Sequence, residues 1–276
     1  MNGSSVPSSA PDRVWLLGLP FDVLTLDDLA ARVHHSARTR ERLFLSTANI
    51  NWVVMCAQDA AMRRSVMDSD LCVADGTPLV WLSRWVGARL PERVAGSALF
   101  NALRRPSTQP PLKVYFFGGP PGVADQACER LNAEGGGCVA VGAQSPGYGD
   151  LDSMSRPEQI DLINAAQPDF VVVSLGARKG QAWIQRNRHT LEAPVIAHLG
   201  AVVSFVAGAL PQAPAWVGRL GAEWLWRIAQ EPTLWRRYGG DALQLAGIML
   251  RHGVRFQYRA DGTVAPWQPA RRANSG

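Results

Sequence analysis

Short apolar runs alternate with longer amphipathic stretches over much of the first 200 residues. The short runs are rich in β-branched and aromatic residues, as strands are, and the stretches between them have helical spacing. The runs near Val114 and Phe170 are almost continuously apolar, which is expected when helices cover both faces of a sheet. The pattern predicts an α/β fold with a Rossmann-like parallel sheet flanked by helices. The expected strands are Arg42–Thr47, Leu71–Ala74, Lys113–Phe117, Cys138–Val141, Asp169–Ser174 and Pro194–His198, with a further strand or hairpin at Val14–Val23.

Three of the amphipathic stretches have an apolar face at helical spacing and predict helices. They are 26–38, 123–133 and 157–166. The first begins with Asp27 and Asp28, whose carboxylates suit the positive end of a helix. These helices occupy intervals between strands, as a layered α/β domain requires.

The pattern changes after Gly208. A turn rich in proline, at Pro211 and Pro214, leads into a segment in which aromatic residues and arginines are interleaved, which predicts a helical appendage. We therefore expect a flexible N-terminus at 1–12, a Rossmann-like domain at 13–210, the appendage at 211–259 and a flexible tail at 260–276. The aromatic residues of the appendage are Trp216, Trp224, Trp226, Trp235 and Tyr238.

Composition limits the protein class. The chain has 276 residues, 47% of them hydrophobic, which is enough for a large core. Its four cysteines form no CxxC pair, so neither a zinc site nor a disulfide framework is indicated. The polar N-terminus lacks the features of a secretion signal, and no stretch approaches the roughly 20 apolar residues of a spanning helix. We expect a cytoplasmic protein whose contact with the inner face of the membrane is peripheral.

The net charge of +5 is compatible with nucleic acid, anionic lipid or a phosphate-bearing substrate. The nucleic-acid interpretation is the weakest, because no recognition motif is visible. The aromatic residues of the appendage can pack on the main domain, lie at a lipid headgroup layer, or join copies of the chain in a homo-oligomer. Arginines accumulate in the same segment, at Arg219, Arg227, Arg236, Arg237, Arg251, Arg255 and Arg259.

Polar residues directly follow several predicted strands, where ligands bind in doubly wound folds. Asp75 precedes a helix that Thr77 and Pro78 can start, so its carboxylate can act as a general base or as a turn residue. Thr47 and Asn49 can bind sugar hydroxyls or cap the next helix, and capping is the more frequent role of such residues.

A glycine-rich loop at 118–122 joins a strand to a helix, where backbone N–H groups can hold a diphosphate. It matches neither the G-x-G-x-x-G fingerprint nor a P-loop, which disfavours a dehydrogenase or an ATPase. The Asp-x-Asp triplets at 68–70 and 150–152 are of a kind that arises by chance, and we expect no metal site there. His198, at a strand end, is expected to be a packed residue.

Taken together, these residues resemble the WecG/TagA/CpsF family of bacterial glycosyltransferases from roughly Leu43 to Tyr238. The matching landmarks follow in order along the chain. They are Thr47 and Asn49, Asp75-Gly76, Glu92-Arg93 with Gly96, Gly118-Gly119 with Gly122, Gly147-Tyr148, Pro168-Asp169, Leu175-Gly176, Trp183-Ile184, Ala207-Gly208, Ala213-Pro214 with Trp216, Glu223-Trp224 with Arg227, Glu231-Pro232 and Arg236-Arg237-Tyr238.

The resemblance implies an inverting, metal-independent transferase without a cofactor. It implies transfer of a hexose or N-acetylhexosamine from a UDP-sugar to a polyprenyl-diphosphate-linked acceptor, in assembly of surface polysaccharide such as exopolysaccharide, enterobacterial-antigen-like or teichoic-acid-like polymer. Asp75 matches the family's base. The substrate-binding residues that we carry over or infer beside it are Thr47, Asn49, Arg93, Gly118, Gly119, Gln181, Arg227 and Arg237.

The sequence departs from the family pattern mainly after Gly176. The segment 176–183 lacks the usual Pro, Gln and Glu spacing, and Ser204, Gln212 and Leu234 stand where the family has other residues. These departures predict a changed sugar, with glucose a candidate beside N-acetylmannosamine, or a loss of activity. The alternative function is a non-catalytic scaffold docked on the membrane during polysaccharide assembly.

Overall fold

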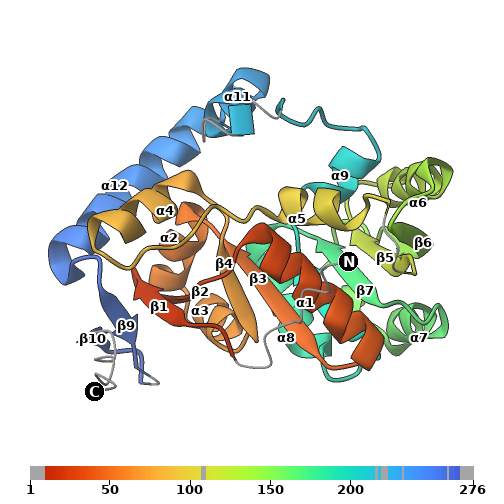
Figure 1. Ribbon diagram of the computed structural model, residues 1–276, viewed down its shortest axis with the longest axis horizontal. Helices are drawn as coiled ribbons and strands as arrows, with labels where there is room; N and C mark the ends of the chain where they lie inside the picture. Colours follow the sequence, from red (N-terminus) through yellow and green to blue (C-terminus); the bar gives the residue numbers. More distant parts are fainter. Residues whose placement is uncertain are drawn as a thin grey trace, which may run out of the picture.

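The protein is built around a six-stranded parallel sheet with strand order β4-β3-β8-β7-β5-β6 (Figure 1). The computed structural model describes residues 10–106, 110–214, 217–218, 223–231, 233–259 and 261–267. The α/β class and all six predicted strands of this sheet are confirmed. The strands are β3 (Leu43–Ala48), β4 (Leu71–Ala74), β5 (Leu112–Gly118), β6 (Cys138–Gln144), β7 (Phe170–Ser174) and β8 (Val195–His198).

Helices pack on both faces of the sheet, and the alternation of side chains along each strand feeds both cores. In β7, Phe170 and Val172 join the core on one face, whereas Val171 and Val173 join the core on the other. All four side chains are buried, which accounts for the continuous apolar run in the sequence. The first face is covered by α1 (Leu26–Thr39), α5 (Gly96–Leu103), α6 (Val123–Glu134) and α9 (Val202–Val206), and the second by α7 (Pro157–Ala165) and α8 (Ala177–Asn187), with the short 3-10 helix at Ser153–Ser155.

A further core lies at the β4 edge of the sheet. It joins β4 to α2 (Ile50–Gln58), α3 (Ala60–Met67) and α4 (Thr77–Trp85). The antiparallel hairpin of β1 (Arg13–Leu16) and β2 (Leu19–Asp22) belongs to the same core, which confirms the hairpin predicted at the N-terminal end. Asp22 anchors it, since its carboxylate accepts hydrogen bonds from the Arg13 guanidinium at 2.8 and 3.1 Å and from the Cys72 backbone at 2.7 Å.

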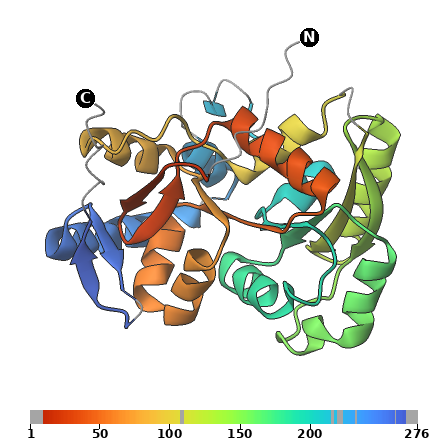
Figure 2. The same ribbon diagram turned by 60° about the horizontal axis from the view of Figure 1, so that its bottom comes forward.

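The chain's last described segment returns to this hairpin. Strands β9 (Phe256–Tyr258) and β10 (Val264–Pro266) pair with each other, and the Gly18 backbone donates to the carbonyl of Phe256 (Figure 2). A Cβ at Gly18 would lie 2.2 Å from the Tyr258 ring, so only glycine allows this contact. The tail expected from residue 260 therefore contains the strand β10, and 268–276, like 1–9 at the other end, lie outside the described residues.

Among the described residues, two helices of eight or more residues belong to the appendage. Helix α11 (Glu223–Gln230) and the long α12 (Leu234–His252) run along one side of the domain. Helix α12 is joined to α2 by the Asn51 amide, which donates to both carboxylate oxygens of Asp241 at 3.1 and 3.0 Å. Over the described residues, no helix is both long and apolar enough to cross a membrane. Trp216, Arg219 and Pro232 of the predicted appendage are outside the described residues.

Candidate active site

A cleft of approximately 770 Å³, the first chamber, lies at the carboxyl edge of the sheet. Residues at or just after the ends of five strands line it, as the fold class leads one to expect. Residues of α11 and α12 line the opposite wall, so the appendage completes the chamber. The strand-end residues are Thr47 (β3), Asp75 (β4), Gly119 (β5), Ser174 (β7) and His198 (β8).

Asp75 is the carboxylate in this chamber that is best placed to act as a base. Burial raises its pKa from the ordinary 3.8 to about 6, because desolvation disfavours the charged form. The Arg93 guanidinium opposes the increase, the Glu223 carboxylate adds to it, and Arg227 opposes it more weakly. A carboxylate with a pKa near 6 is ionised at neutral pH yet holds a proton more tightly than an ordinary aspartate, which suits general-base catalysis.

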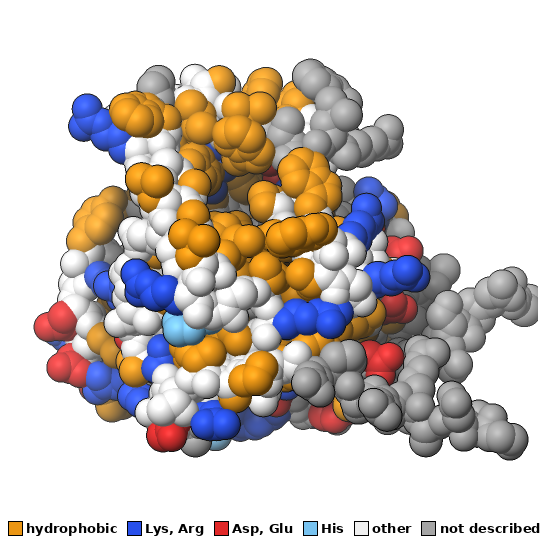
Figure 3. All heavy atoms as spheres, turned by 90° about the vertical axis from the view of Figure 1, so that its left-hand side faces the viewer, with side chains coloured by type: hydrophobic (Ala, Val, Ile, Leu, Met, Phe, Trp, Pro, Cys, Tyr) orange, Lys and Arg blue, Asp and Glu red, His pale blue; other side chains and the backbone are white. Residues whose placement is uncertain are grey.

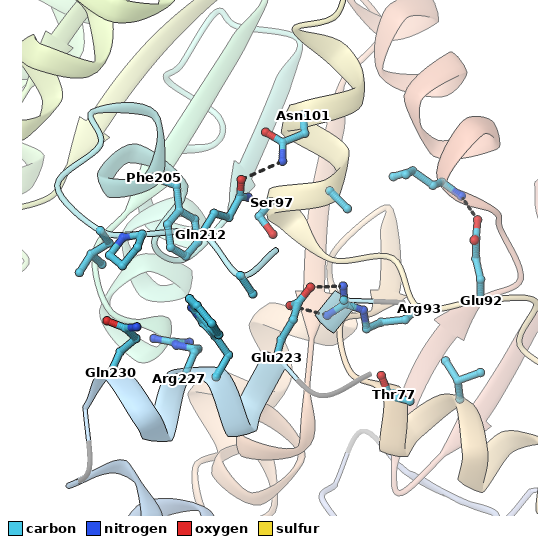
Figure 4. Close-up of a pocket in the computed structure, with 18 of the residues that line it drawn as sticks. Thr77, Glu92, Arg93, Ser97, Asn101, Phe205, Gln212, Glu223, Arg227 and Gln230 are labelled. Atoms are coloured by element: carbon cyan, nitrogen blue, oxygen red, sulfur yellow. Dashed lines mark hydrogen bonds and ion pairs between the residues drawn. The ribbon is translucent and has the colours of Figure 1, made fainter. Parts of the chain in front are cut away.

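Arg93 and Glu223 form a bidentate ion pair beside Asp75. The two guanidinium nitrogens lie 2.6 and 2.7 Å from the two carboxylate oxygens, and both side chains are partly buried. Glu223 is the first residue of α11, whereas Arg93 precedes α5, so the pair ties the appendage to the domain. Figure 4 shows the two side chains facing each other. Arg93 thus lines the cleft as expected, with Glu223 already partly neutralising its charge.

Thr47 and Asn49 both lie in the first chamber. The Asn49 carbonyl oxygen accepts a hydrogen bond from the Trp52 backbone at 3.2 Å and caps α2, which is the capping role considered from the sequence. The Thr47 hydroxyl donates to the carbonyl of His198 at 3.3 Å. Each side chain therefore has a structural contact, and each also faces the space where a substrate would bind.

The two glycines of the loop after β5 have different roles: one permits close packing of strands, and the other lines the chamber. Gly118 has φ +107°, and a Cβ there would lie 2.5 Å from the Ser174 carbonyl oxygen, so this glycine permits close packing of β5 on β7. Gly119, with φ +88°, lines the first chamber. Gly118 does not line this chamber. Of the two predicted binding glycines, the structure brings Gly119 to the site and leaves Gly118 behind it.

Gln181 is not at the site, which corrects the sequence prediction. Its side chain is fully buried in α8, where its oxygen accepts from the Ser65 hydroxyl at 2.7 Å and its nitrogen donates to the Ser46 hydroxyl at 3.2 Å. These contacts join α3, β3 and α8 behind the sheet edge. Gln181 is five residues after Gly176, which does line the first chamber. Within α8, however, the Gln181 side chain points into the core.

The two predicted arginines of the appendage reach the first chamber from separate helices. Arg227 comes from α11 and Arg237 from α12, where it also lies over the Tyr238 ring at 5.2 Å. Trp224 and Tyr238, in edge-to-face contact with ring centroids 6.4 Å apart, line the same wall. The wall therefore combines cations, which can bind phosphates, with aromatic faces, which can contact a sugar or base.

A second chamber of approximately 970 Å³ adjoins the first. Both chambers share Thr77, Arg93, Ser97, Glu223 and Arg227 as well as Phe205. Figure 4 shows this second chamber, with α5 on one side and α11 on the other. The ion pair of Arg93 and Glu223 thus stands at the boundary between two connected spaces.

Sequence reasoning missed several residues of the first chamber. The sequence assigns Glu223 no role, because nothing in the local sequence indicates that it meets Arg93, 130 positions earlier. His198 was expected to be packed, and it is buried, with its pKa lowered to about 4 by desolvation. The residue lines the first chamber, and its buried Nε2 has no hydrogen-bond partner among the described residues. A neutral imidazole there can donate or accept a hydrogen bond.

The acidic triplets have structural contacts. Asp70 accepts from the Phe44 backbone at 2.6 Å, and Asp68 accepts from the Gln185 amide at 2.7 Å. Asp152 pairs with Arg186. Within the described ranges, no three His, Cys, Asp or Glu side chains gather in a way that could hold a metal ion.

The chain is similar in sequence to bacterial transferases. An N-acetylglucosaminyldiphosphoundecaprenol N-acetyl-beta-D-mannosaminyltransferase of Bacillus spizizenii is 29% identical over 194 residues, which cover 70% of this chain and 74% of the relative. The protein of the same name from Staphylococcus aureus (strain MRSA252) is 26% identical over 229 residues, covering 82% and 87% of the two chains. A solved structure of an arylmalonate decarboxylase mutant is similar over 69% of this chain, with 16% identity and a TM-score of 0.24.

The family model described as "Glycosyl transferase WecG/TagA/CpsF family" matches residues 14–259. The match extends from the first strand of the N-terminal hairpin to the end of α12 and the strand after it, so it includes the domain and the appendage that together line the first chamber. The chain belongs to the WecG/TagA/CpsF family of glycosyltransferases.

Proposed function

We propose that this protein is an inverting glycosyltransferase that moves a sugar from a UDP-sugar to a saccharide linked to polyprenyl diphosphate. The observation that carries the proposal is Asp75, a carboxylate with a pKa of about 6 at the carboxyl edge of the sheet, with Arg93 and Arg227 beside it. Family membership and the printed names of the relatives, which specify a lipid-diphosphate-linked acceptor, support the substrate class.

In the proposed reaction, ionised Asp75 takes the proton of an acceptor hydroxyl. The hydroxyl oxygen forms a bond to the anomeric carbon of the donor as the bond from that carbon to the UDP oxygen breaks. The electron pair of the broken bond leaves with UDP, and the single displacement inverts the anomeric configuration. General-base catalysis of this kind typically contributes 10²–10⁴-fold.

Negative charge grows on the departing diphosphate during this step. Arg227 and Arg237 line the first chamber from the appendage, and Arg93 lines it from the domain, so the three predicted arginines can offset this charge. Gly119, whose φ is positive, lines the chamber from the strand-end side, and its backbone can approach a phosphate closely. We propose that these groups take the role that a divalent ion has in other transferases.

The identity of the sugar is open to two proposals from the same site. The relatives are named as N-acetylmannosaminyltransferases, which supports an N-acetylhexosamine donor. The residues that depart from the family pattern favour a changed sugar, because Ser204 lines the first chamber whereas Gln212 and Leu234 line the second. A neutral hexose such as glucose remains the specific alternative.

We also propose that the protein works on the inner face of the cell membrane, as a lipid-linked acceptor requires. Large hydrophobic side chains are exposed on α4, α11 and α12, with Trp85 74% and Leu250 89% accessible to solvent. Figure 3, which views the molecule from the side of α12, shows hydrophobic side chains gathered over the upper part of this face. Exposed tryptophan and leucine beside arginine suit the headgroup region of a bilayer.

The experiment that tests the proposal is UDP release by the purified protein. A panel of UDP-sugars is offered with polyprenyl-diphosphate-linked mono- and disaccharides, with and without EDTA. We expect acceptor-dependent release that survives EDTA and is lost in Asp75→Asn while donor binding remains. A scaffold would tolerate Asp75→Asn and release no UDP, and release abolished by EDTA would contradict the metal-independent step.

A further inference from the structure

The second chamber is a separate space beside the first. It is larger than the first chamber, at approximately 970 against 770 Å³, and extends from the shared boundary toward Leu210 and Gln212. Helices α4 and α5 of the domain form one side, and α11 forms the other. Asp75 lines only the first chamber, so the second chamber has no part in holding the base.

The polar groups of the second chamber are those that recognise sugar hydroxyls. The Asn101 amide nitrogen donates to the side-chain oxygen of Gln212 at 3.2 Å on one side of the chamber, and Gln230 lies on the opposite side (Figure 4). The indole N–H of Trp226 is buried and has no acceptor among the described residues. Amides supply both donors and acceptors, and an indole combines an apolar face with one donor, which is the combination that binds a pyranose ring.

Among the described residues, three arginines and three carboxylates line this chamber, so its formal charges balance; besides Glu92 and Glu223, the third carboxylate is Glu231. Glu223 is paired with Arg93, and Glu92 accepts from the Leu26 backbone at 2.7 Å. Arg84 and Arg227 also line the chamber, and no ion pair of either is present within the described residues. Guanidinium groups are well suited to bind diphosphate oxygens. The chamber therefore offers amides, an aromatic ring and cations together.

Two of the large side chains that line the chamber are hydrophobic and exposed to solvent. Trp81 lines it and is 58% exposed, and Leu210 lines it and is also exposed. Trp85 follows Trp81 one helical turn later on α4 and is exposed as well. An amphiphile bound with its polar head inside would find these side chains where its hydrocarbon chain leaves the protein.

We propose that the second chamber binds the saccharide-diphosphate head of the lipid-linked acceptor, and that the acceptor meets the donor at the boundary by Thr77 and Ser97. The inference rests on the proposed function and adds the division of the two substrates between two chambers. The donor occupies the first chamber with Gly119 and Arg237, which do not line the second. The attacking hydroxyl then reaches Asp75 from the side of Arg93 and Glu223.

Three variants of the second chamber test the assignment. Trp226→Phe removes one N–H and keeps an aromatic ring, whereas Asn101→Ala and Gln230→Ala each remove an amide. We expect each variant to raise the KM for the acceptor about fivefold, because each removes about one hydrogen bond to the acceptor. The KM for the UDP-sugar should stay unchanged within about twofold. Gln126→Ala, an exposed amide on α6 outside both chambers, is the matched control and should change neither constant.

A second measurement keeps this assignment separate from the proposed function. Binding of a short-chain prenyl-diphosphate-linked N-acetylglucosamine is measured by titration calorimetry without donor, on the wild-type protein and the three variants. If wild-type protein shows no transfer but binds this probe, and the variants weaken binding, the chamber assignment stands and the transferase proposal fails. An acceptor affinity equal in all proteins, or equal changes in the donor and acceptor constants, would overturn the assignment.

Discussion

Glu223→Gln tests whether the appendage tunes the base. The carboxylate of Glu223 raises the pKa of Asp75 directly and also partly neutralises Arg93, the cation that lowers this pKa most. Glutamine keeps a side chain of the same size that can still accept a hydrogen bond from Arg93, but it removes the negative charge. Both effects act in the same direction, so the pKa of Asp75 should fall from about 6 toward its ordinary value of 3.8.

The size of the change follows from the charge that is lost. Removal of one nearby charge changes a pKa by about one unit or more, and one unit corresponds to about 1.4 kcal/mol between the two protonation states. The rate depends on ionised Asp75, so activity declines as pH falls through its pKa. The acid limb of the pH profile of kcat should therefore lie near pH 6 in the wild type and about one unit lower in Glu223→Gln.

The assay is UDP release at saturating donor and acceptor between pH 4.5 and 8.5. Glu129→Gln removes an exposed carboxylate on α6, outside both chambers, and should leave the limb in place. Thermal melting of Glu223→Gln checks that the protein remains folded. An acid limb that stays near pH 6 in a folded Glu223→Gln protein would refute the reasoning, as would a shift to higher pH.

Three further predictions concern stability and the membrane. The raised pKa of Asp75 means that the folded state binds the proton more tightly than the unfolded state, so stability falls as pH rises from about 4 to about 6. Asp75→Asn should therefore stabilise the protein at pH 7.5, by on the order of 1–3 kcal/mol, and have little effect on stability at pH 4. Urea unfolding at the two pH values measures the change, and equal effects at both would contradict the prediction. Gly118→Ala should destabilise the fold by at least 1–3 kcal/mol in the same assay, because φ is +107° and the new methyl group would meet the Ser174 carbonyl. Trp81→Ser with Trp85→Ser should reduce sedimentation with anionic lipid vesicles several-fold, and unchanged sedimentation would exclude α4 as a membrane contact.

The sheet could be predicted because the relevant signal is local. The apolar runs that end at Thr47, Ala74 and His198 are short and bounded by polar residues, and each became a strand of the sheet. Because ligand-binding residues follow such strands, the positions of Thr47 and Asp75 in the first chamber could also be predicted.

The missed features depend on contacts between distant parts of the chain. The ion pair between Arg93 and Glu223 and the second chamber beside it arise only when α11 packs against the domain, which no local pattern indicates. Gln181 was assigned to the site by its distance along the chain from a family motif, whereas the helical turn places its amide in the core. The hairpin of β9 and β10 was missed because three-residue strands carry too little alternation to be distinguished from a tail.

The central claim is that Asp75 is the base of a sugar transfer, and single-turnover transfer measures it most directly. Wild-type protein and Asp75→Asn, each in excess over a radiolabelled UDP-sugar, are mixed with the prenyl-diphosphate-linked acceptor, and product is followed with time. The account predicts equal donor binding and a transfer rate at least 100-fold lower in Asp75→Asn. Transfer by Asp75→Asn at a rate close to that of the wild type would contradict it.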